Sequence, residues 1–156
     1  MTVMNQLFKG EVITIGACDG SRFISTATRT FSIGVDKEFA RWDLDKRRSA
    51  TLATNVSVYE QIERVTFVQM FGSLNSHFDK LAFTQDQIIE FCEKHRSRLR
   101  KDGYSTFFLF KEDDQFFVAR VNEFTNGLYA IFYRLDYGDA WSAGYRYRVV
   151  VPQLNT

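Results

Sequence analysis

Two cysteines and two histidines could carry chemistry, and one cysteine lies close to one histidine in the sequence. Cys92 and His95 are three residues apart, so on a helix they would share one face and could form a thiol–imidazole pair. Such a nucleophile needs an accessible thiolate and an oriented base, and two side chains alone do not hold zinc. The apolar residues around the pair therefore favour a packed cysteine and a hydrogen-bonded histidine.

Cys18 lies in the short segment ACDGS, whose small residues would suit a reactive loop but are also typical of a hairpin turn. No histidine is positioned beside it, and His77 has no carboxylate pair at an interpretable spacing. The sequence also lacks a Walker loop, a dinucleotide fingerprint, HExxH, GxSxG and CxxC. We therefore predict no catalytic residues, no metal site and no cofactor, and an enzyme with Cys18 or Cys92 as nucleophile is the least favoured hypothesis.

Arginines and aromatic residues alternate in the C-terminal part of the chain. If the alternation follows strands, four arginines could gather on one side of a sheet beside exposed rings: Arg120, Arg134, Arg146 and Arg148. Rings and arginines on an open sheet are one way in which proteins hold RNA. The alternative is that these arginines pair with Asp136, Asp139 or Glu123, and six acids against five bases from Gly103 onward favour it.

A second basic region is expected at the end of a helix. Arg96 and Arg100 project from one flank of the apolar stripe, and Lys94, Arg98 and Lys101 project from the other. This region could bind phosphate or an acidic partner, whereas the alternative is a solvated face whose charge favours the helix C-terminus. Arg96 and Arg100 join the four strand arginines as candidates for nucleic-acid binding.

The segment from Asp136 to Gly144 carries two large aromatic residues, Tyr137 and Trp141, and Tyr145 follows it. Rings in such a loop either fold back onto the sheet or are displayed to a partner, and folding back is the favoured arrangement. If the loop is open, Tyr137, Trp141 and Tyr145 are the candidate contacts with a protein partner, because tyrosine and tryptophan dominate interface energetics.

One helix is expected to organise the fold, from residue 85 to residue 101. Thr84 and Gln87 form a capping box that would start it, and Asp102-Gly103 would end it. Phe83 and Ile88 are placed to form a hydrophobic staple. The buried stripe of this helix would contain Ile88, Cys92, His95 and Leu99.

Period-two alternation after Gly103 predicts four strands, at residues 105–111, 116–123, 128–135 and 145–151. Asn126-Gly127 is a strong hairpin signal, and the short connections predict an antiparallel meander that Pro152 ends. The helix should pack on one face of this curved sheet.

The first half of the chain is less regular. We predict a loose arm or a short edge strand at 1–10, a hairpin made of 11–15 and 22–26, and short strands at 30–35 and 39–44. Residues 51–62 and 64–71 fit two strands or a strand and a short helix, and their β-branched content favours two strands. Residues 72–81 read as a loop or a single helical turn.

The composition describes one globular domain, residues 1–156, with 45% hydrophobic, 25% charged and 16% aromatic residues. A net charge of +1 gives no general attraction to nucleic acid, so such binding would need a local patch. We expect neither a secretion signal nor a membrane span, because no long uncharged apolar run occurs. Two distant cysteines suit a reducing cytoplasm.

The run FTQDQIIEFCEKHRSRLRKDGYSTFFLFKEDDQFFVARV and the ending WSAGYRYRVVVPQL resemble short uncharacterised proteins predicted from genomes of candidate-phylum bacteria. Those proteins share a helix, a Phe-rich strand and a VVPQL-like tail, and the resemblance covers about residues 50–156. It implies a bacterial, intracellular origin. It implies no activity, cofactor, partner or functional residue.

These patterns together predict an α+β fold, with one main helix packed on a curved, mainly antiparallel sheet that has a C-terminal four-strand meander. The leading hypothesis is a small non-catalytic binding module in the cytoplasm, away from membranes. It would contact a protein partner, or a second copy of itself, through the aromatic sheet face or residues 137–145. The alternative is a nucleic-acid-binding protein that uses the arginines and aromatic residues of the C-terminal sheet.

Overall fold

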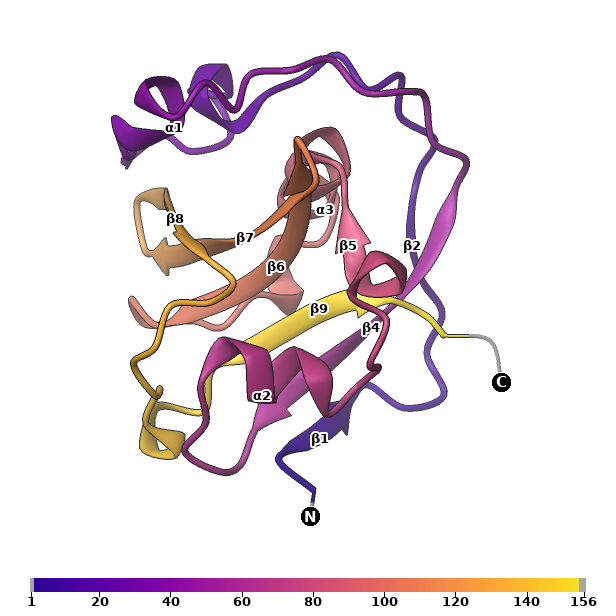
Figure 1. The fold of residues 1–156 in the computed structure, drawn as a ribbon, viewed down its shortest axis with the longest axis vertical. Coiled ribbons are helices and arrows are strands. Elements are labelled where there is room, and N and C mark those ends of the chain that lie inside the picture. The colour runs from indigo at the N-terminus through magenta and orange to yellow at the C-terminus, as the bar shows by residue number, and fades with distance from the viewer. Residues whose placement is uncertain (1, 155–156) are drawn as a thin grey trace.

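The computed structural model describes residues 2–154, so the ends of the expected 1–156 domain lie outside the description (Figure 1). The helices are α1 (Glu38–Arg41), α2 (Phe67–Gly72) and α3 (Gln85–Lys94). The strands are β1 (Met4–Leu7), β2 (Ile13–Ile15), β3 (Gly34–Val35), β4 (Thr54–Gln61), β5 (Ala82–Phe83), β6 (Ser105–Glu112), β7 (Gln115–Phe124), β8 (Gly127–Arg134) and β9 (Arg148–Pro152). Short 3-10 turns occupy Ile24–Thr26, Phe78–Leu81, Arg96–Arg98 and Ala143–Tyr145.

The strands of the described chain form one open, mixed sheet with the order β1-β4-β9-β6-β7-β8-β3. β2 also pairs with β4, and β5 also pairs with β6. Most pairs are antiparallel, but β6 with β9, β5 with β6 and β3 with β8 are parallel. The α+β class and the mainly antiparallel sheet are therefore confirmed. None of the described helices is both long enough and apolar enough to cross a membrane.

The predicted four-strand meander is only partly present. β6, β7 and β8 are antiparallel neighbours, and Gly127 begins β8 directly after the hairpin turn. The prediction that β9 continues this meander is wrong, because β9 lies between β4 and β6 and runs parallel to β6. Tight turns force neighbouring strands to pair, whereas the long connection 135–147 can cross the sheet before its strand begins. That crossing carries Tyr137, Trp141 and Tyr145 over the sheet.

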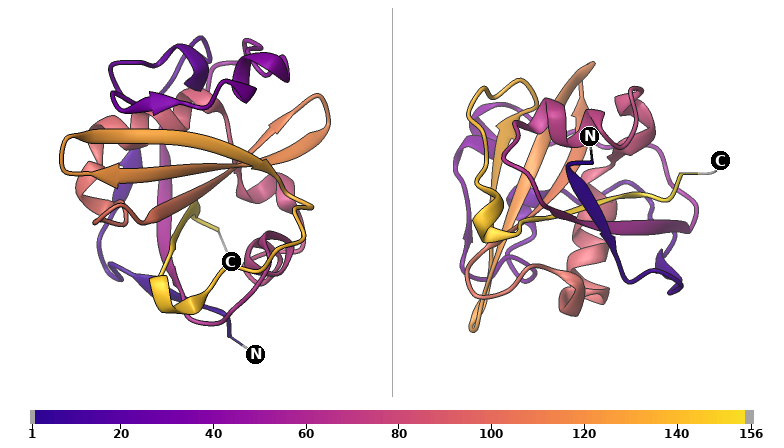
Figure 2. Two further views of the ribbon diagram at one scale, coloured as in Figure 1. Left: turned by 90° about the vertical axis from the view of Figure 1, so that its left-hand side faces the viewer. Right: turned by 90° about the horizontal axis from the view of Figure 1, so that it is seen from below.

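The pleat of the sheet sorts its side chains onto two faces. On β6, Phe108 and Phe110 belong to one buried cluster, and Phe107 and Leu109 belong to another. Helix α3 and the N-terminal segment cover the first face, which we call the α3 face. Helix α2 and the connection 135–147 cover the second, the α2 face. Figure 1 shows α2 and α3 on different sides of the sheet, and Figure 2 shows the same layers from two further directions.

The predicted start of α3 is confirmed, and its predicted end is wrong. The Thr84 hydroxyl accepts the Gln87 N–H at 3.2 Å, and the Gln87 side chain accepts the Thr84 N–H at 2.9 Å. The helix stops at Lys94, because the backbone of His95 leaves helical geometry with φ −128° and ψ 35°. The 3-10 turn that follows places Leu99 in the core, where it is fully buried.

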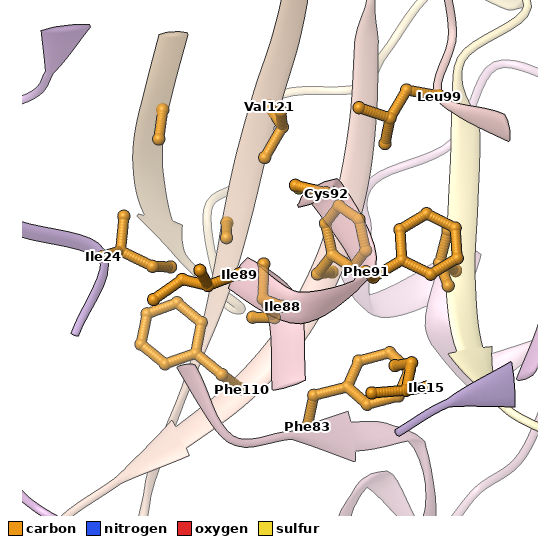
Figure 3. Packing of buried hydrophobic residues seen from close by; sticks show 14 of the residues in the cluster. Ile15, Ile24, Phe83, Ile88, Ile89, Phe91, Cys92, Leu99, Phe110 and Val121 are labelled. Carbon is orange, nitrogen blue, oxygen red and sulfur yellow. The ribbon is translucent and has the colours of Figure 1, made fainter. Parts of the chain in front are cut away.

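The α3 face contains the larger apolar core. Figure 3 shows the helix side chains Ile88, Ile89, Phe91 and Cys92 gathered near Phe110 and Val121 of the sheet. Complete burial of one such aliphatic or aromatic side chain contributes roughly 1.5–3 kcal/mol. Burial of this stripe, more than the surface charges of the helix, therefore holds α3 on the sheet.

The first half of the chain departs most from the sequence-based expectations. β1 is an edge strand on β4, so the edge-strand alternative for residues 1–10 is correct and the loose arm is wrong. The predicted hairpin is wrong, because β2 pairs with β4 while residues 24–26 form a 3-10 turn. Of the strand predicted at 30–35 only β3 exists, and the strand predicted at 39–44 is wrong because α1 overlaps it. The second strand predicted at 64–71 is also wrong, since α2 begins there.

The N-terminal segment takes this path because it is fastened to the start of α3. The Gly20 N–H donates to Asp86 at 2.9 Å, and the Ile24 N–H donates to Gln85 at 3.0 Å. The Gln85 amide in turn donates to the Leu44 carbonyl at 2.7 Å. These buried contacts join residues far apart in sequence, so local patterns do not reveal them.

Candidate functional site

Arg120 lies on the α2 face, on the middle strand of the β6, β7 and β8 group. The register of β6, β7 and β8 aligns Phe107, Arg120 and Ile131, and residues in register on antiparallel strands point to the same face. Tyr129 and Tyr133 lie two residues on either side of Ile131 and share that face. Apart from Phe107, these residues are partly exposed. Arg120 therefore lies where the face passes from core to surface.

The guanidinium of Arg120 is held by groups from three segments. Nε donates to the Ser105 hydroxyl at 2.7 Å, and Nη1 donates to the Tyr133 hydroxyl at 3.1 Å. The guanidinium carbon lies 5.1 Å from the ring centroid of Trp141, which is a cation–π arrangement. Ser105 is itself oriented, because its hydroxyl donates to Asn122 at 2.9 Å. The position of the charge is therefore fixed by the fold.

The charge of Arg120 has no carboxylate partner within residues 2–154. None of the ion pairs found there includes it. Partly buried charges are ordinarily paired, because the protein interior solvates them less well than water does. Here the neighbours are neutral hydroxyl oxygens and an aromatic ring, so the positive charge is positioned but uncompensated.

Trp141 folds back against the sheet beside Arg120. Its backbone N–H donates to the Val65 carbonyl at 2.9 Å, and its backbone carbonyl accepts a hydrogen bond from the Gln61 side-chain amide at 2.6 Å. The Trp141 ring centroid lies 5.0 Å from those of Phe67 and Phe107. Its indole N–H is buried and has no acceptor within the described residues. Trp141 therefore supports the surface from below and is not displayed on a free loop.

Tyr137 and Tyr145 form the exposed rim of this surface, with exposed fractions of 36% and 46%. The Tyr137 ring lies 4.8 Å from the Tyr133 ring, and Tyr145 stacks on Tyr104 at 5.2 Å with an interplanar angle of 29°. The Tyr137 hydroxyl donates to Asp139 at 2.9 Å, and this hydrogen bond raises the pKa of Tyr137. The rim is therefore aromatic, with phenol hydroxyls at its edge.

The hypothesis that the strand arginines gather on one side is wrong. Arg120 is in register with Ile131, and Arg134 is three residues further along β8, so their side chains leave opposite faces. Arg134 also pairs with Asp136 at 3.2 Å, which is the alternative that the charge balance favours. Arg120 is thus separated from Arg134.

The remaining candidate arginines lie near chain turns and strand ends. Arg96, Arg100 and Arg148 each donate to a backbone carbonyl, at 2.9, 3.1 and 2.7 Å. Burial lowers the pKa of Arg148, and the nearby Arg100 charge also lowers it. Arg146 is exposed and has a left-handed backbone with φ 50°. Only Arg100 of these four reaches the rim in the described chain, since its guanidinium carbon lies 4.8 Å from the Tyr104 ring centroid.

Cys92, Cys18 and His95 are packed against the rest of the fold. Cys92 is 2% exposed, and burial raises the pKa of its thiol, so the thiolate is disfavoured. Cys18 is also buried, and burial followed by the charge of Asp86 raises its pKa. His95 places Nε2 2.8 Å from the Thr14 carbonyl. The interpretation of Cys92 and His95 as a packed cysteine and a hydrogen-bonded histidine is confirmed, whereas Cys18 does not lie in the predicted hairpin. No group of three or more His, Cys, Asp or Glu within residues 2–154 could hold a metal ion.

A separate groove lies between β4, β5 and the hairpin of β6 and β7, and both acids and bases line it. Lys111 on its wall pairs with Asp79 at 2.9 Å, and Arg48 pairs with the buried Glu112 at 2.6 Å. Two of its cations therefore already have acidic partners, and Asp79, Asp113 and Asp114 also line it, so the groove has less to gain from an external anion. We therefore place the candidate site at Arg120 and not in this groove.

Sequence reasoning missed four residues that build the site: Tyr104, Ser105, Asn122 and Tyr133. The period-two alternation of residues 128–135 does contain the signal, because Tyr129, Ile131 and Tyr133 form a second set opposite the more apolar one. The hydrogen bonds of Ser105 and Asn122 depend on the register across two strands, which has no local signal. Comparison of the chain with protein-family models, with curated proteins and with solved structures finds no match.

Proposed function

We propose that this protein is a small, non-catalytic binding module that contacts a protein partner through the α2 face. The contact surface comprises Arg120 and the rings of Tyr133, Tyr137 and Tyr145, and Trp141 supports these residues from below. The observation that supports this most is the Arg120 guanidinium, which three segments hold in place without a carboxylate from residues 2–154. Such an arrangement lowers stability relative to an apolar or paired residue, and a ligand that brings the missing contacts offsets that cost.

A protein partner suits this surface better than a nucleic acid does. Tyrosine, tryptophan and arginine are the residues at which protein interfaces concentrate their binding energy. A nucleic acid instead follows a path of several cations along its backbone. Arg134 leaves the opposite face, and of the other candidate arginines in residues 2–154 Arg100 reaches the rim, so two separated cations and not a continuous row lie along this surface.

A photo-crosslinking experiment tests the proposal. A benzophenone amino acid replaces Tyr145 in the chain produced in cells, and irradiation joins it to whatever contacts that position. Trp42 is a matched control position, because its exposed fraction of 44% is close to the 46% of Tyr145 and it packs against Phe117 and Phe132 on the α3 face.

We expect a discrete protein adduct from position 145 that is absent from position 42 and weakened by Tyr137→Ala. The same adducts from both positions, or no adduct from position 145, would contradict the proposal. An adduct with RNA or DNA alone would favour the nucleic-acid alternative.

A further inference from the structure

We propose that the partner segment is acidic and that Arg120 binds one of its carboxylates. This inference rests on the proposed function and names the chemistry of the partner. Arg120 uses Nε on Ser105 and Nη1 on Tyr133, and residues 2–154 supply no acceptor for Nη2. A guanidinium has five N–H donors in a fixed fork, so the edge formed by Nη1 and Nη2 keeps free donors. Two parallel N–H groups on one edge match the two oxygens of a carboxylate.

The orientation of that edge is fixed before any ligand arrives. The guanidinium carbon of Arg120 lies over the Trp141 ring, 5.1 Å from its centroid. The hydrogen bonds to the Ser105 and Tyr133 hydroxyls restrict rotation of the guanidinium. A donor set that is already ordered loses little conformational entropy when an anion binds. Water solvates the Arg120 charge less completely than it solvates an exposed arginine, because Arg120 is partly buried.

A second uncompensated guanidinium lies at the other end of a continuous run of rings. From Arg120 outward the rings in contact are Trp141, Tyr147, Tyr145 and Tyr104, with successive centroid distances of 5.5, 5.7 and 5.2 Å. Arg100 lies over the last of these rings, at 4.8 Å, and makes no ion pair within the described residues. Tyr147 is buried, whereas Tyr145 and Tyr104 are at least partly exposed. A segment with two acidic residues separated by apolar ones complements a surface that is cationic at both ends and has these exposed rings between them.

The acids around this surface disfavour a polyanion with a charge on every unit. Asp139 accepts the Tyr137 hydroxyl at the rim, and Asp136 lies on the same connection. A nucleic-acid backbone would bring its phosphates near these carboxylates, whereas a peptide can space its acids to meet Arg120 and Arg100 alone. Charge complementarity therefore favours an acidic peptide segment of a protein.

Fluorescence titration of defined peptides tests this inference. Trp42→Phe leaves Trp141 as the only tryptophan, so emission reports on the ring beside Arg120. The probe is a blocked hexapeptide of alternating glutamate and phenylalanine, and its control has glutamine in place of glutamate. We expect saturable binding of the glutamate peptide, with about tenfold weaker binding of the glutamine peptide, because a hydrogen bond to a charged group is lost.

Variants of Arg120 identify the residue that binds. Arg120→Gln should weaken the glutamate peptide about tenfold, and Arg120→Lys should weaken it less, because lysine keeps the charge but not the fork. Arg29→Gln makes the same charge change at an exposed residue and should leave binding unchanged. Circular dichroism before titration selects variants that are folded, and Arg120→Lys keeps the test available if Arg120→Gln does not fold.

Three results would overturn the inference: equal affinity for the two peptides, unchanged binding by folded Arg120 variants, or binding of a short oligouridylate but not of the glutamate peptide. The crosslink from position 145 separates this failure from that of the proposed function. A protein adduct that persists in Arg120→Gln leaves a partner-binding surface whose ligand is not acidic. If no protein adduct forms from position 145 in the chain with Arg120 intact, the proposed function itself is contradicted.

Discussion

Arg22 and Arg120 are both partly buried, and the fold treats their charges in opposite ways. Arg22 contacts three carboxylates, those of Asp86, Glu93 and Glu90, at 2.6, 2.7 and 3.3 Å. Arg120 contacts two hydroxyls and a ring, and it contacts no carboxylate of residues 2–154. One charge is paired with carboxylates inside the molecule, and the other has no carboxylate of residues 2–154 beside it.

The difference follows from what each arginine joins. Arg22 belongs to the N-terminal segment and its acids belong to α3, so the ion network fastens two parts of the chain. Burial tends to lower the pKa of Arg22, but hydrogen bonds to Glu93 and Asp86 outweigh burial and raise it. Arg120 and its neighbours instead belong to adjacent strands and to a loop packed on them, which the sheet and the ring cluster already hold together. Its charge is therefore not needed for assembly.

The largest loss of stability is expected from Asp86→Ala, which removes one of the three carboxylates that contact Arg22. Asp86 is 2% exposed and also accepts the Gly20 N–H, so its removal leaves a buried donor and part of a guanidinium unpaired. We expect a loss of about 2–3 kcal/mol in the free energy of unfolding, measured by urea titration. Asp114→Asn, at a fully exposed carboxylate, is the control and should change it by less than about 0.5 kcal/mol. Equal effects of the two variants would contradict a structural role for the Arg22 network.

Replacement of each tryptophan by alanine measures how much its ring contributes to stability on the α2 face and on the α3 face. Trp141→Ala removes a ring that contacts Phe67, Phe107 and Tyr147, and it should lower the free energy of unfolding by about 2 kcal/mol. Trp42→Ala removes a more exposed ring on the α3 face and should cost about 1 kcal/mol or less. Thermal unfolding of both variants checks this order, and the reverse order would show that the connection 135–147 is loosely attached.

Arg120→Met separates stability from binding. Methionine keeps most of the side-chain volume and removes the uncompensated charge, so the free energy of unfolding should stay within about 1 kcal/mol of the wild type or rise. Binding of the glutamate peptide should weaken about tenfold in the same variant, as in Arg120→Gln. Urea titration and fluorescence titration on one sample provide both values. A loss of several kcal/mol in stability would mean that Arg120 is a structural residue like Arg22.

The smallest expected effect on the free energy of unfolding comes from protonation of Glu93 in the Arg22 network at low pH. Burial tends to raise the pKa of Glu93, but hydrogen bonds from Arg22 and Thr30 outweigh it and hold the pKa below the ordinary 4.5. The stabilisation is therefore present above about pH 4.5 and is lost as the pH falls below that value. Glu93 is partly exposed, so its contribution is less than about 1 kcal/mol.

Urea titrations across the acidic range, compared between wild type and Arg22→Gln, measure that contribution. The variant should lose less stability on acidification than the wild type does, while Arg29→Gln should behave like the wild type. A steeper acid dependence in Arg22→Gln would contradict the sign of this linkage.

Local signals in the sequence predict the elements whose determinants are local. The capping box at Thr84 and Gln87 gives the start of α3, and the alternation after Gly103 gives β6, β7 and β8. Thr66 and Gln69 form the same kind of box at α2, so that helix could have been found as well. Long-range contacts decide the rest: the path of the N-terminal segment depends on Asp86 and Gln85, and the place of β9 depends on a long connection.

The candidate site shows the same limit. Arg120, Tyr137, Trp141 and Tyr145 can be selected from residue type alone. The structure connects the last three rings beside Arg120, with Tyr147 between Trp141 and Tyr145. The sequence does not reveal that Arg134 leaves the opposite face, because that depends on the register of one hairpin. Nor does it distinguish Arg22 from Arg120, since only the folded chain shows which arginine has acids beside it.

Nitrogen-15 NMR of the arginine side chains tests the central claim most directly, because it observes Arg22 and Arg120 in one titration. We expect the glutamate peptide to shift the Nε and Nη signals of Arg120 saturably, while those of Arg22 stay unchanged in their carboxylate network. Unchanged Arg120 signals at peptide concentrations that saturate the fluorescence change, or equal shifts at the two arginines, would contradict the claim that Arg120 is held free for an acidic partner.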